Sequence, residues 1–310
     1  MHVPVMLAEC LEYLALKPDG VYLDATTGLG GHAGAIARRL TTGVLLACDR
    51  DAESLELAKA NTIEKLGGDC AERIHFHQSL FSQLADVLTE EKIPQLDGLL
   101  VDLGISRYQL TEGERGFSLM SDGPLDMRMS RDVPGTAADL VNFTAEKELA
   151  NLIYEYGEER RSRQIARAIV RARPIQTTGQ LAKLIEGAAS RTGKIHPATQ
   201  TFMALRIVVN REFEEVDALL ESIPRLVKPG GRVVMLTFHS LEDRKVKHAF
   251  QALAKEGRAR LLTKHVVKPG EQETRDNPPS RSAKLRAVEI LSTETDLSAS
   301  QVGGKKKWQR

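Results

Sequence analysis

The stretch that decides the fold of this 310-residue chain is Asp24-Ala-Thr-Thr-Gly28-Leu-Gly30-Gly31-His32. It follows the short apolar run Val21–Leu23 and precedes a helix-like stretch at 32–40, which gives the order strand, glycine-rich loop, helix. Glycine lets the backbone turn sharply and approach a ligand closely, because no Cβ stands in the way. The loop therefore predicts a site for a nucleoside-containing cofactor.

Strands and helices alternate through the first hundred residues. Further apolar runs predict strands at 43–49, 74–77 and 96–102, with a helix at 52–65. This alternation is typical of a parallel sheet covered on both faces. Asp24, Asp49 and Asp102 end three of the strands, and ligands of such sheets bind beyond the carboxyl ends. We expect the three acids to share one site.

The alternation stops in the middle of the chain. Segment 110–210 has no strand pattern, and its helical periods fall at 134–143, 146–154, 158–172, 179–189 and 198–213. The α/β order resumes with a helix at 214–226, a turn at 228–231, a strand at 232–238, a helix at 243–254 and strands at 260–268 and 283–291. The sequence thus predicts an α/β domain of 1–109 and 211–310, interrupted by an all-helical insert at 110–210. The polar tail 293–310, with Lys305–Lys307, is expected to be flexible.

Composition excludes several classes of protein. No run of about 18 apolar residues is present, so no membrane span is expected. The N-terminus lacks the features of a signal peptide, and the isolated Cys10, Cys48 and Cys70 fit a reducing, cytoplasmic environment better than a metal site. The net charge of +1 means that any basic surface must be local.

Charge discriminates between two cofactors for the loop. Asp49 follows Gly28 by 21 residues and could accept the ribose hydroxyls of an adenosine in either case. The pyrophosphate of NAD would be opposed by Asp24 and Asp102, whereas the sulfonium and amino group of S-adenosylmethionine would be attracted. The balance favours S-adenosylmethionine. The structural alternative is an ordinary turn in which Asp49 caps the next helix.

Several longer segments, in order along the chain, carry a family resemblance. They are 2–7 (His-Val-Pro-Val-Met-Leu), 24–32, 102–106, 115–118, 122–129 (Asp-Gly-Pro-Leu-Asp-Met-Arg-Met), 156–160, 196–202, 238–244 and 280–286. With them the chain resembles the ribosomal RNA small-subunit methyltransferase H family. The resemblance implies a class I S-adenosylmethionine-dependent methyltransferase fold (a Rossmann-like sheet) with a helical insert. It also implies methylation of N4 of a cytidine in the decoding region of 16S rRNA.

The resemblance also implies which residues contact the cofactor. These are Gly30, Gly31, His32, Asp49, Phe81, Asp102 and Gln109. Phe81 would pack on the adenine, although a core phenylalanine explains it equally well without the family. Gln109 keeps its register, but the family pattern Ser-Ser-Pro-Gln-Leu reads Ser106-Arg-Tyr-Gln-Leu here, and Asn277-Pro-Pro-Ser replaces the usual Asn-Pro-Arg-Ser.

The chemistry needs groups that orient a poorly nucleophilic amine and accept its proton. The candidates are Asp102, the backbone carbonyls of 102–105 and His239, which follows the fifth strand. A structural histidine at a strand end is the alternative for His239. Asn277-Pro-Pro-Ser imitates the Asn-Pro-Pro-aromatic turn of amino-methyltransferases, but it lacks the aromatic residue and is interpreted as a loop.

An arginine stripe is the candidate RNA contact. Arg160, Arg163, Arg167 and Arg171 are spaced three and four apart, which places them in one stripe on a predicted helix. Such a stripe beside a reactive cleft is what phosphate contacts require. The alternative is a solvated face paired with Glu158 and Glu159. The segment 122–129 would either wall the base pocket or brace the insert.

Other functions remain open at this point. The chain could methylate another amine, in DNA or in a protein. It could also be an RNA-binding assembly factor that holds the cofactor as a structural ligand, or an NAD oxidoreductase. The expected partner is 16S rRNA or the small ribosomal subunit, and the chain is expected to be a monomer or a homodimer.

Overall fold

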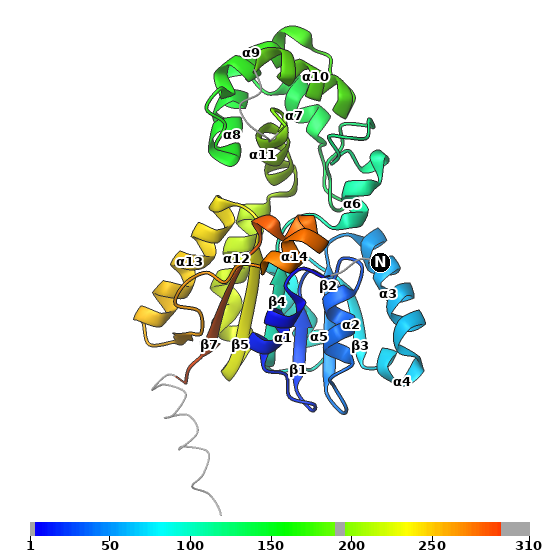
Figure 1. Cartoon of the computed structure of the whole chain (residues 1–310), viewed down its shortest axis with the longest axis vertical. Helices are drawn as coiled ribbons and strands as arrows, with labels where there is room; N and C mark the ends of the chain where they lie inside the picture. Colours follow the sequence, from blue (N-terminus) through cyan, green and yellow to red (C-terminus); the bar gives the residue numbers. More distant parts are fainter. Residues whose placement is uncertain (1–3, 190–195, 293–310) are drawn as a thin grey trace, which may run out of the picture. The chain divides into compact units, whose positions relative to one another are not determined.

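The computed structural model describes residues 4–189 and 196–292. The tail 293–310 predicted to be flexible lies outside these residues, as do His2 and Val3. Two compact units divide the chain: Met1–Asp49, Leu57–Gly104 and Asp217–Arg310 form the first, and Arg50–Glu56 with Ile105–Val216 form the second. We call them the sheet unit and the helical unit (Figure 1). That 110–210 acts as a domain of its own stays a prediction.

The sheet unit carries a seven-stranded sheet of order β3-β2-β1-β4-β5-β7-β6. Its strands are β1 (Val21–Asp24), β2 (Val44–Asp49), β3 (Ile74–Gln78), β4 (Leu96–Asp102), β5 (Val227–Thr237), β6 (Ala259–Leu261) and β7 (Lys284–Ile290). Its helices are α1 (Leu7–Leu14), α2 (Gly31–Ala37), α3 (Ala52–Leu66), α4 (Gly68–Ala71), η1 (Phe81–Gln83), α5 (Leu84–Glu90), α12 (Glu212–Leu226), α13 (Ser240–Lys255), α14 (Glu271–Asp276) and η3 (Pro278–Ser282). The first residues of α3 and α12 belong to the helical unit.

The central strands are nearly continuous apolar runs because both of their faces are covered. β4 is buried from Leu96 to Val101, as expected for a strand inside a parallel sheet. On one face α1 packs against β4 and β5, and α2 packs against β2 (Figure 1). Leu14 and Ile36 from these two helices share one core with Leu100 of β4. The fold is the expected class I methyltransferase architecture, an α/β sheet with a helical insert.

Strands β1 to β4 are parallel, as predicted for the first hundred residues. The sheet as a whole is mixed, because β7, whose direction was not predicted, runs antiparallel to both β5 and β6. Two details differ from the sequence prediction. β5 begins at Val227, and the predicted turn at 228–231 is a bulge inside the β4–β5 ladder, which resumes at Gly98 and Arg232. The predicted strand 260–268 is reduced to β6 and an isolated bridge at Val267. These differences arise from pairing partners, which local patterns do not reveal.

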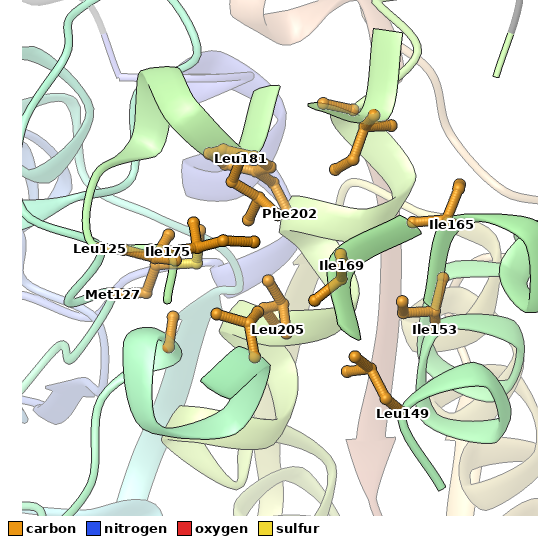
Figure 2. Close-up of a cluster of buried hydrophobic side chains, with 14 of the residues drawn as sticks. Leu125, Met127, Leu149, Ile153, Ile165, Ile169, Ile175, Leu181, Phe202 and Leu205 are labelled. Carbon is orange, nitrogen blue, oxygen red and sulfur yellow. The ribbon is translucent and has the colours of Figure 1, made fainter. Parts of the chain in front are cut away.

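The helical unit is built from short helices around a separate apolar core. They are α6 (Arg107–Thr111), η2 (Gly113–Arg115), α7 (Ala137–Phe143), α8 (Glu146–Gly157), α9 (Ser162–Ala172), α10 (Thr178–Ala188) and α11 (Thr199–Asn210). Figure 2 shows Ile153, Ile165, Ile169 and Leu205 turned into this core. In the described part of 110–210 the only β pairing is an isolated bridge, so the predicted all-helical character is confirmed.

The predicted helix 158–172 begins late. Glu158 has a left-handed backbone (φ 51°), and α9 starts at Ser162, so the predicted first turn is not helical. Arg160 therefore lies in a turn before α9. No helix among the described residues is long and apolar enough to cross a membrane.

Candidate active site

The glycine-rich loop between β1 and α2 meets the end of β2. The Gly28 N–H donates a 2.8 Å hydrogen bond to Asp49 Oδ2, so the two features that define the predicted site lie in contact. Gly30 has a left-handed backbone (φ 83°), and a Cβ there would lie 2.8 Å from Thr62 Oγ1. The loop therefore requires glycine at this position because of both its backbone conformation and the close approach of α3.

Asp51, rather than Asp49, caps the following helix. Its Oδ1 accepts hydrogen bonds from the backbone N–H groups of Glu53 (3.1 Å) and Ser54 (3.5 Å), in the first turn of α3. The structural alternative for Asp49 is therefore wrong. The Asp49 carboxylate is half-buried and contacts the loop, where the prediction of a ribose contact needs it.

Asp24 is fully buried at the end of β1. Its Oδ1 accepts a 3.1 Å hydrogen bond from the Thr26 N–H, whereas no described residue donates to its Oδ2. Burial raises the pKa of the Asp24 carboxyl to about 7; hydrogen bonds from Thr26 oppose the rise, and the charge of Asp49 adds to it. The site thus holds a buried acid with one carboxyl oxygen that no described residue pairs.

Asp102 repeats this arrangement at the end of β4. Its N–H donates to Thr26 Oγ1 (2.6 Å), and its buried Oδ1 has no hydrogen-bond partner among the described residues. Burial raises the pKa of the Asp102 carboxyl to about 8, and the negative charges of Asp24 and Glu242 reinforce the rise. Three strand ends and the start of α13 therefore bring four acids to one edge of the sheet.

The donor set tests which cofactor fits. Two buried carboxyl oxygens without partners, beside a glycine-rich loop, suit a ligand that brings positive charge. S-adenosylmethionine carries a sulfonium and an α-amino group. Asp24 could hold these groups, the negative charge of Asp102 would attract them, and Asp49 could take the ribose. A pyrophosphate would add negative charge where acids already raise one another's pKa, so these residues do not fit NAD.

His32 and Gly31 contact the N-terminal segment. The buried His32 ring places Nε2 3.0 Å from the Val5 carbonyl oxygen and Nδ1 3.8 Å from Asp102 Oδ2. A Cβ on Gly31 would lie 2.6 Å from Pro4 Cγ, so only glycine allows this approach. The segment that opens the chain thus packs on the cofactor loop, a contact that the sequence analysis did not predict.

Phe81 and Gln109, the other predicted cofactor contacts, lie in different units. Phe81 is half-buried in η1 of the sheet unit. Gln109 is buried in the helical unit and forms a capping box with Ser106, so the altered Ser-Arg-Tyr-Gln segment keeps a regular turn. Its Nε2 also donates to Asp51 Oδ2 (2.7 Å). Both cofactor contacts stay predictions.

His239 is the N-cap of α13. Its Nδ1 accepts from the Glu242 N–H at 3.4 Å, and its Nε2 lies 2.9 Å from Glu242 Oε1. The Phe238 N–H donates to Glu242 Oε2 (3.0 Å), so one buried carboxylate organises the whole strand end. This arrangement favours a structural histidine, and a catalytic role for His239 stays a prediction. The sequence analysis missed Glu242, although its spacing from His239 is that of a capping box.

The predicted arginine stripe is exposed. Arg163, Arg167 and Arg171 lie on α9, and Arg160 lies in the turn before it. The opposite side of α9 is buried in the core of the helical unit. Arg167 forms a 3.6 Å ion pair with Glu146.

The segment 122–129 is a structural part of the helical unit. Leu125 and Met127 are buried in its core (Figure 2). Asn210 of α11 accepts from the Met129 N–H (2.7 Å) and donates to the Met127 carbonyl oxygen (2.7 Å). The Asp126 carboxylate pairs with Arg128 at 2.8 Å. The spacing of this octapeptide is thus explained by packing. No group of side chains that could bind a metal ion occurs at 4–189 or 196–292.

The chain is similar to known proteins over nearly its full length. Ribosomal RNA small subunit methyltransferase H of Solibacter usitatus is 57% identical over 290 residues, covering 94% of this chain and all of the relative. The protein of the same name from Acidobacterium capsulatum is 50% identical over 293 residues (93% and 98% covered). Among solved structures, a SAM-dependent O-methyltransferase from Thermotoga maritima aligns with a TM-score of 0.43 and 11% identity, covering 95% and 69%. The model of the MraW methylase family matches residues 1–291, and the chain therefore belongs to that family.

Proposed function

We propose that this chain is an S-adenosylmethionine-dependent methyltransferase that modifies N4 of a cytidine in the decoding region of 16S rRNA. The near full-length identity to methyltransferases named for small-subunit rRNA supports the substrate. The observation that carries the chemistry is the pair of unpartnered buried oxygens on Asp24 and Asp102, beside the glycine-rich loop. They suit a cationic methyl donor.

The acidic residues of the sheet unit have different roles in catalysis. When bound, S-adenosylmethionine supplies an electrophilic methyl group on a sulfonium. Asp24 and Asp49 hold and orient the donor, through its cationic groups and its ribose respectively. The Asp102 carboxyl and the backbone carbonyls of 102–105 accept hydrogen bonds from the exocyclic amine and align it with the methyl carbon. Asp102 then accepts the proton that the amine loses.

The helical insert, 110–210, is the proposed substrate-recognition domain of the enzyme. Its exposed Arg160, Arg163, Arg167 and Arg171 would contact phosphates on 16S rRNA or on the assembled small subunit. Between Arg160 and Arg173 the chain carries no acidic residue, so positive charge is concentrated there while the whole chain has a net charge of +1. Such a substrate implies a cytoplasmic enzyme. A monomer or a homodimer stays the expected oligomeric state.

Methyl transfer to small subunits lacking the modification tests this function. Labelled S-adenosylmethionine, the protein and subunits from a strain without the gene are incubated, and digested nucleosides are analysed by mass spectrometry. N4-methylcytidine is the expected product, and Asp49→Asn is the control with a weakened donor site. Label in DNA or protein instead would identify a different amine. Tight binding of the donor with no transfer to any substrate would indicate an assembly factor.

A calorimetric titration separates the two cofactors. We expect S-adenosylhomocysteine to bind and NAD to give no heat above dilution, because the acids at the strand ends oppose a pyrophosphate. Tight NAD binding without a response to S-adenosylhomocysteine would overturn the proposed function.

A further inference from the structure

The side-chain amide of Gln109 is held at both of its ends. Its Oε1 accepts a 3.0 Å hydrogen bond from the Ser106 N–H, and its Nε2 donates a 2.7 Å hydrogen bond to Asp51 Oδ2. A backbone N–H can only donate and an ionised carboxylate can only accept, so these partners fix which end of the amide is the nitrogen. Gln109 is only 3% exposed. Among the described residues, one N–H of Nε2 and one lone pair of Oε1 are left for a ligand.

A buried arginine holds Asp51 in turn. Arg115 Nη1 forms a 2.9 Å ion pair with Asp51 Oδ2, and at the same distance it donates to Glu53 Oε2. The side chains of Arg115 and Asp51 are each 3% exposed. A carboxylate that has lost its water needs a cation or hydrogen-bond donors close to it. Arg115 therefore supplies the charge that keeps the acceptor of Gln109 in place.

Arg115 is anchored on its other side to the segment 122–129. Its Nη2 donates to the carbonyl oxygens of Arg128 (3.1 Å) and Met129 (2.8 Å). The Met129 N–H donates to Asn210 Oδ1 of α11, which fixes this anchor. All of these residues belong to the helical unit. Two of the segments that carry the family resemblance thus meet at one guanidinium.

We propose that Arg115 is a positioning residue for the cofactor, which acts through Asp51 to hold Gln109 in the orientation that contacts it. The inference rests on the proposed function and on the predicted contact of Gln109 with the cofactor. A long amide side chain that is ordered before the ligand arrives loses less freedom when the ligand binds, so the affinity is higher. Arg115 itself touches neither cofactor nor substrate.

A double-mutant cycle separates positioning from simple packing. We expect Gln109→Ala to lower the affinity for S-adenosylhomocysteine on the order of tenfold, as the loss of a buried hydrogen bond does. Arg115→Lys keeps the charge, but a single ammonium cannot reach the carboxylates and the carbonyls together, so the affinity should fall several-fold. In the Gln109→Ala background, Arg115→Lys should change the affinity by less than about twofold, because the side chain that it positions is gone.

The matched control is Arg173→Lys. The Arg173 guanidinium donates to the carbonyl oxygens of Val141 and Thr144 in the same unit, but it has no contact with Asp51 or Gln109 among the described residues. This variant should keep the affinity of the wild type, and thermal unfolding of every variant reports any loss of stability.

Two results of the cycle would overturn the proposal. Additive effects of the two substitutions would make Arg115 a structural residue that acts independently of Gln109. An unchanged affinity in Gln109→Ala would mean that this side chain does not contact the ligand. Failure of the proposed function looks different. A wild-type protein that binds no S-adenosylhomocysteine would refute both ideas, whereas coupling without methylation of rRNA would refute only the proposed substrate.

A measurement on the unaltered protein decides the question if Arg115→Lys does not fold. In the ligand-free protein, ¹⁵N relaxation of Gln109 Nε2 should give an order parameter near that of rigid backbone, about 0.85, and S-adenosylhomocysteine should shift its signal. An order parameter below about 0.6 would show a mobile side chain before binding and would contradict the proposal.

Discussion

At the scale of single residues, the acids at the strand ends make cofactor binding a proton-linked event. Asp24 and Asp102 have pKa values raised to about 7 and about 8, so near neutral pH Asp24 is about half protonated and Asp102 is mostly protonated. A bound sulfonium and ammonium favour the ionised carboxylates. We therefore predict that S-adenosylmethionine binding at pH 7 releases on the order of one proton. The affinity should rise with pH, by up to about tenfold per pH unit per proton released, and level off above the higher pKa.

Calorimetry in two buffers of different ionisation enthalpy measures the protons released. S-adenosylhomocysteine, which lacks the sulfonium charge, should release fewer, and Asp24→Asn should remove the part that belongs to Asp24. Equal heats in both buffers would contradict the prediction. The stability of the unliganded protein depends on pH in the opposite direction to the cofactor affinity. Protonation of these carboxyls stabilises the fold fully below their ordinary pKa of 3.8, and this stabilisation is lost as the pH rises through 7 to 8.

The sequence could predict the acids but not their neighbours. Asp24, Asp49 and Asp102 each end an apolar run, and the geometry of parallel sheets brings such ends together. By contrast, the Val5 carbonyl reaches His32 through a backbone contact that has no signature in side-chain type. Glu242 was missed because a histidine stands at the N-cap position, where serine, threonine or aspartate is the usual signal.

At the scale of elements, the exposed arginines of α9 lead to a measurable prediction about RNA binding. Arg163→Ala, Arg167→Ala and Arg171→Ala should each weaken binding to small-subunit rRNA without changing affinity for S-adenosylhomocysteine. Each lost phosphate contact should reduce the slope of log affinity against log salt by about 0.7 to 0.9. Filter binding at several salt concentrations measures this slope.

The control for α9 is Arg39→Ala, which removes the same charge from an exposed position of the sheet unit. An equal loss in this variant would mean that net charge, and not the α9 surface, governs binding. Arg160 lies outside the helix, so Arg160→Ala tests whether the stripe predicted from sequence extends into the preceding turn. Arg167 should show the smallest effect of the three helical arginines, because Glu146 already pairs with it.

Elements were predictable where one local signal sufficed. β4 was placed at its observed bounds because its buried residues are continuous. The start of α9 was missed because Glu158 adopts a left-handed conformation that its residue type does not favour. The bulge at 228–231 carries a correct turn signal, with Gly230 at φ 80°, but pairing of Val227 with Leu96 extends the strand beyond it.

At the scale of the whole molecule, the discontinuous architecture was visible as a change of period. Alternation of strand and helix stops after Asp102 and returns at β5, and the structure fills the interval with helices. What remained hidden was why the segment 122–129 has its spacing. Its buried Leu125 and Met127 belong to a core formed with helices α7 to α11, and such packing has no local pattern.

A last prediction concerns Gln109. The family resemblance makes it a cofactor contact, although it belongs to the helical unit. If the assignment holds, S-adenosylhomocysteine should slow amide hydrogen exchange at 24–37 and 44–49 in the sheet unit and at 106–111 in the helical unit. Helices α8 and α10 should keep their rates. At a ligand concentration 100 times Kd the bound state gains about 2.7 kcal/mol, so amides that exchange through the ligand-free state should slow by about 100-fold. NAD is the matched control ligand. Protection confined to the sheet unit would remove Gln109 from the cofactor site, because a direct contact must slow the opening of α6, whose capping box contains that side chain.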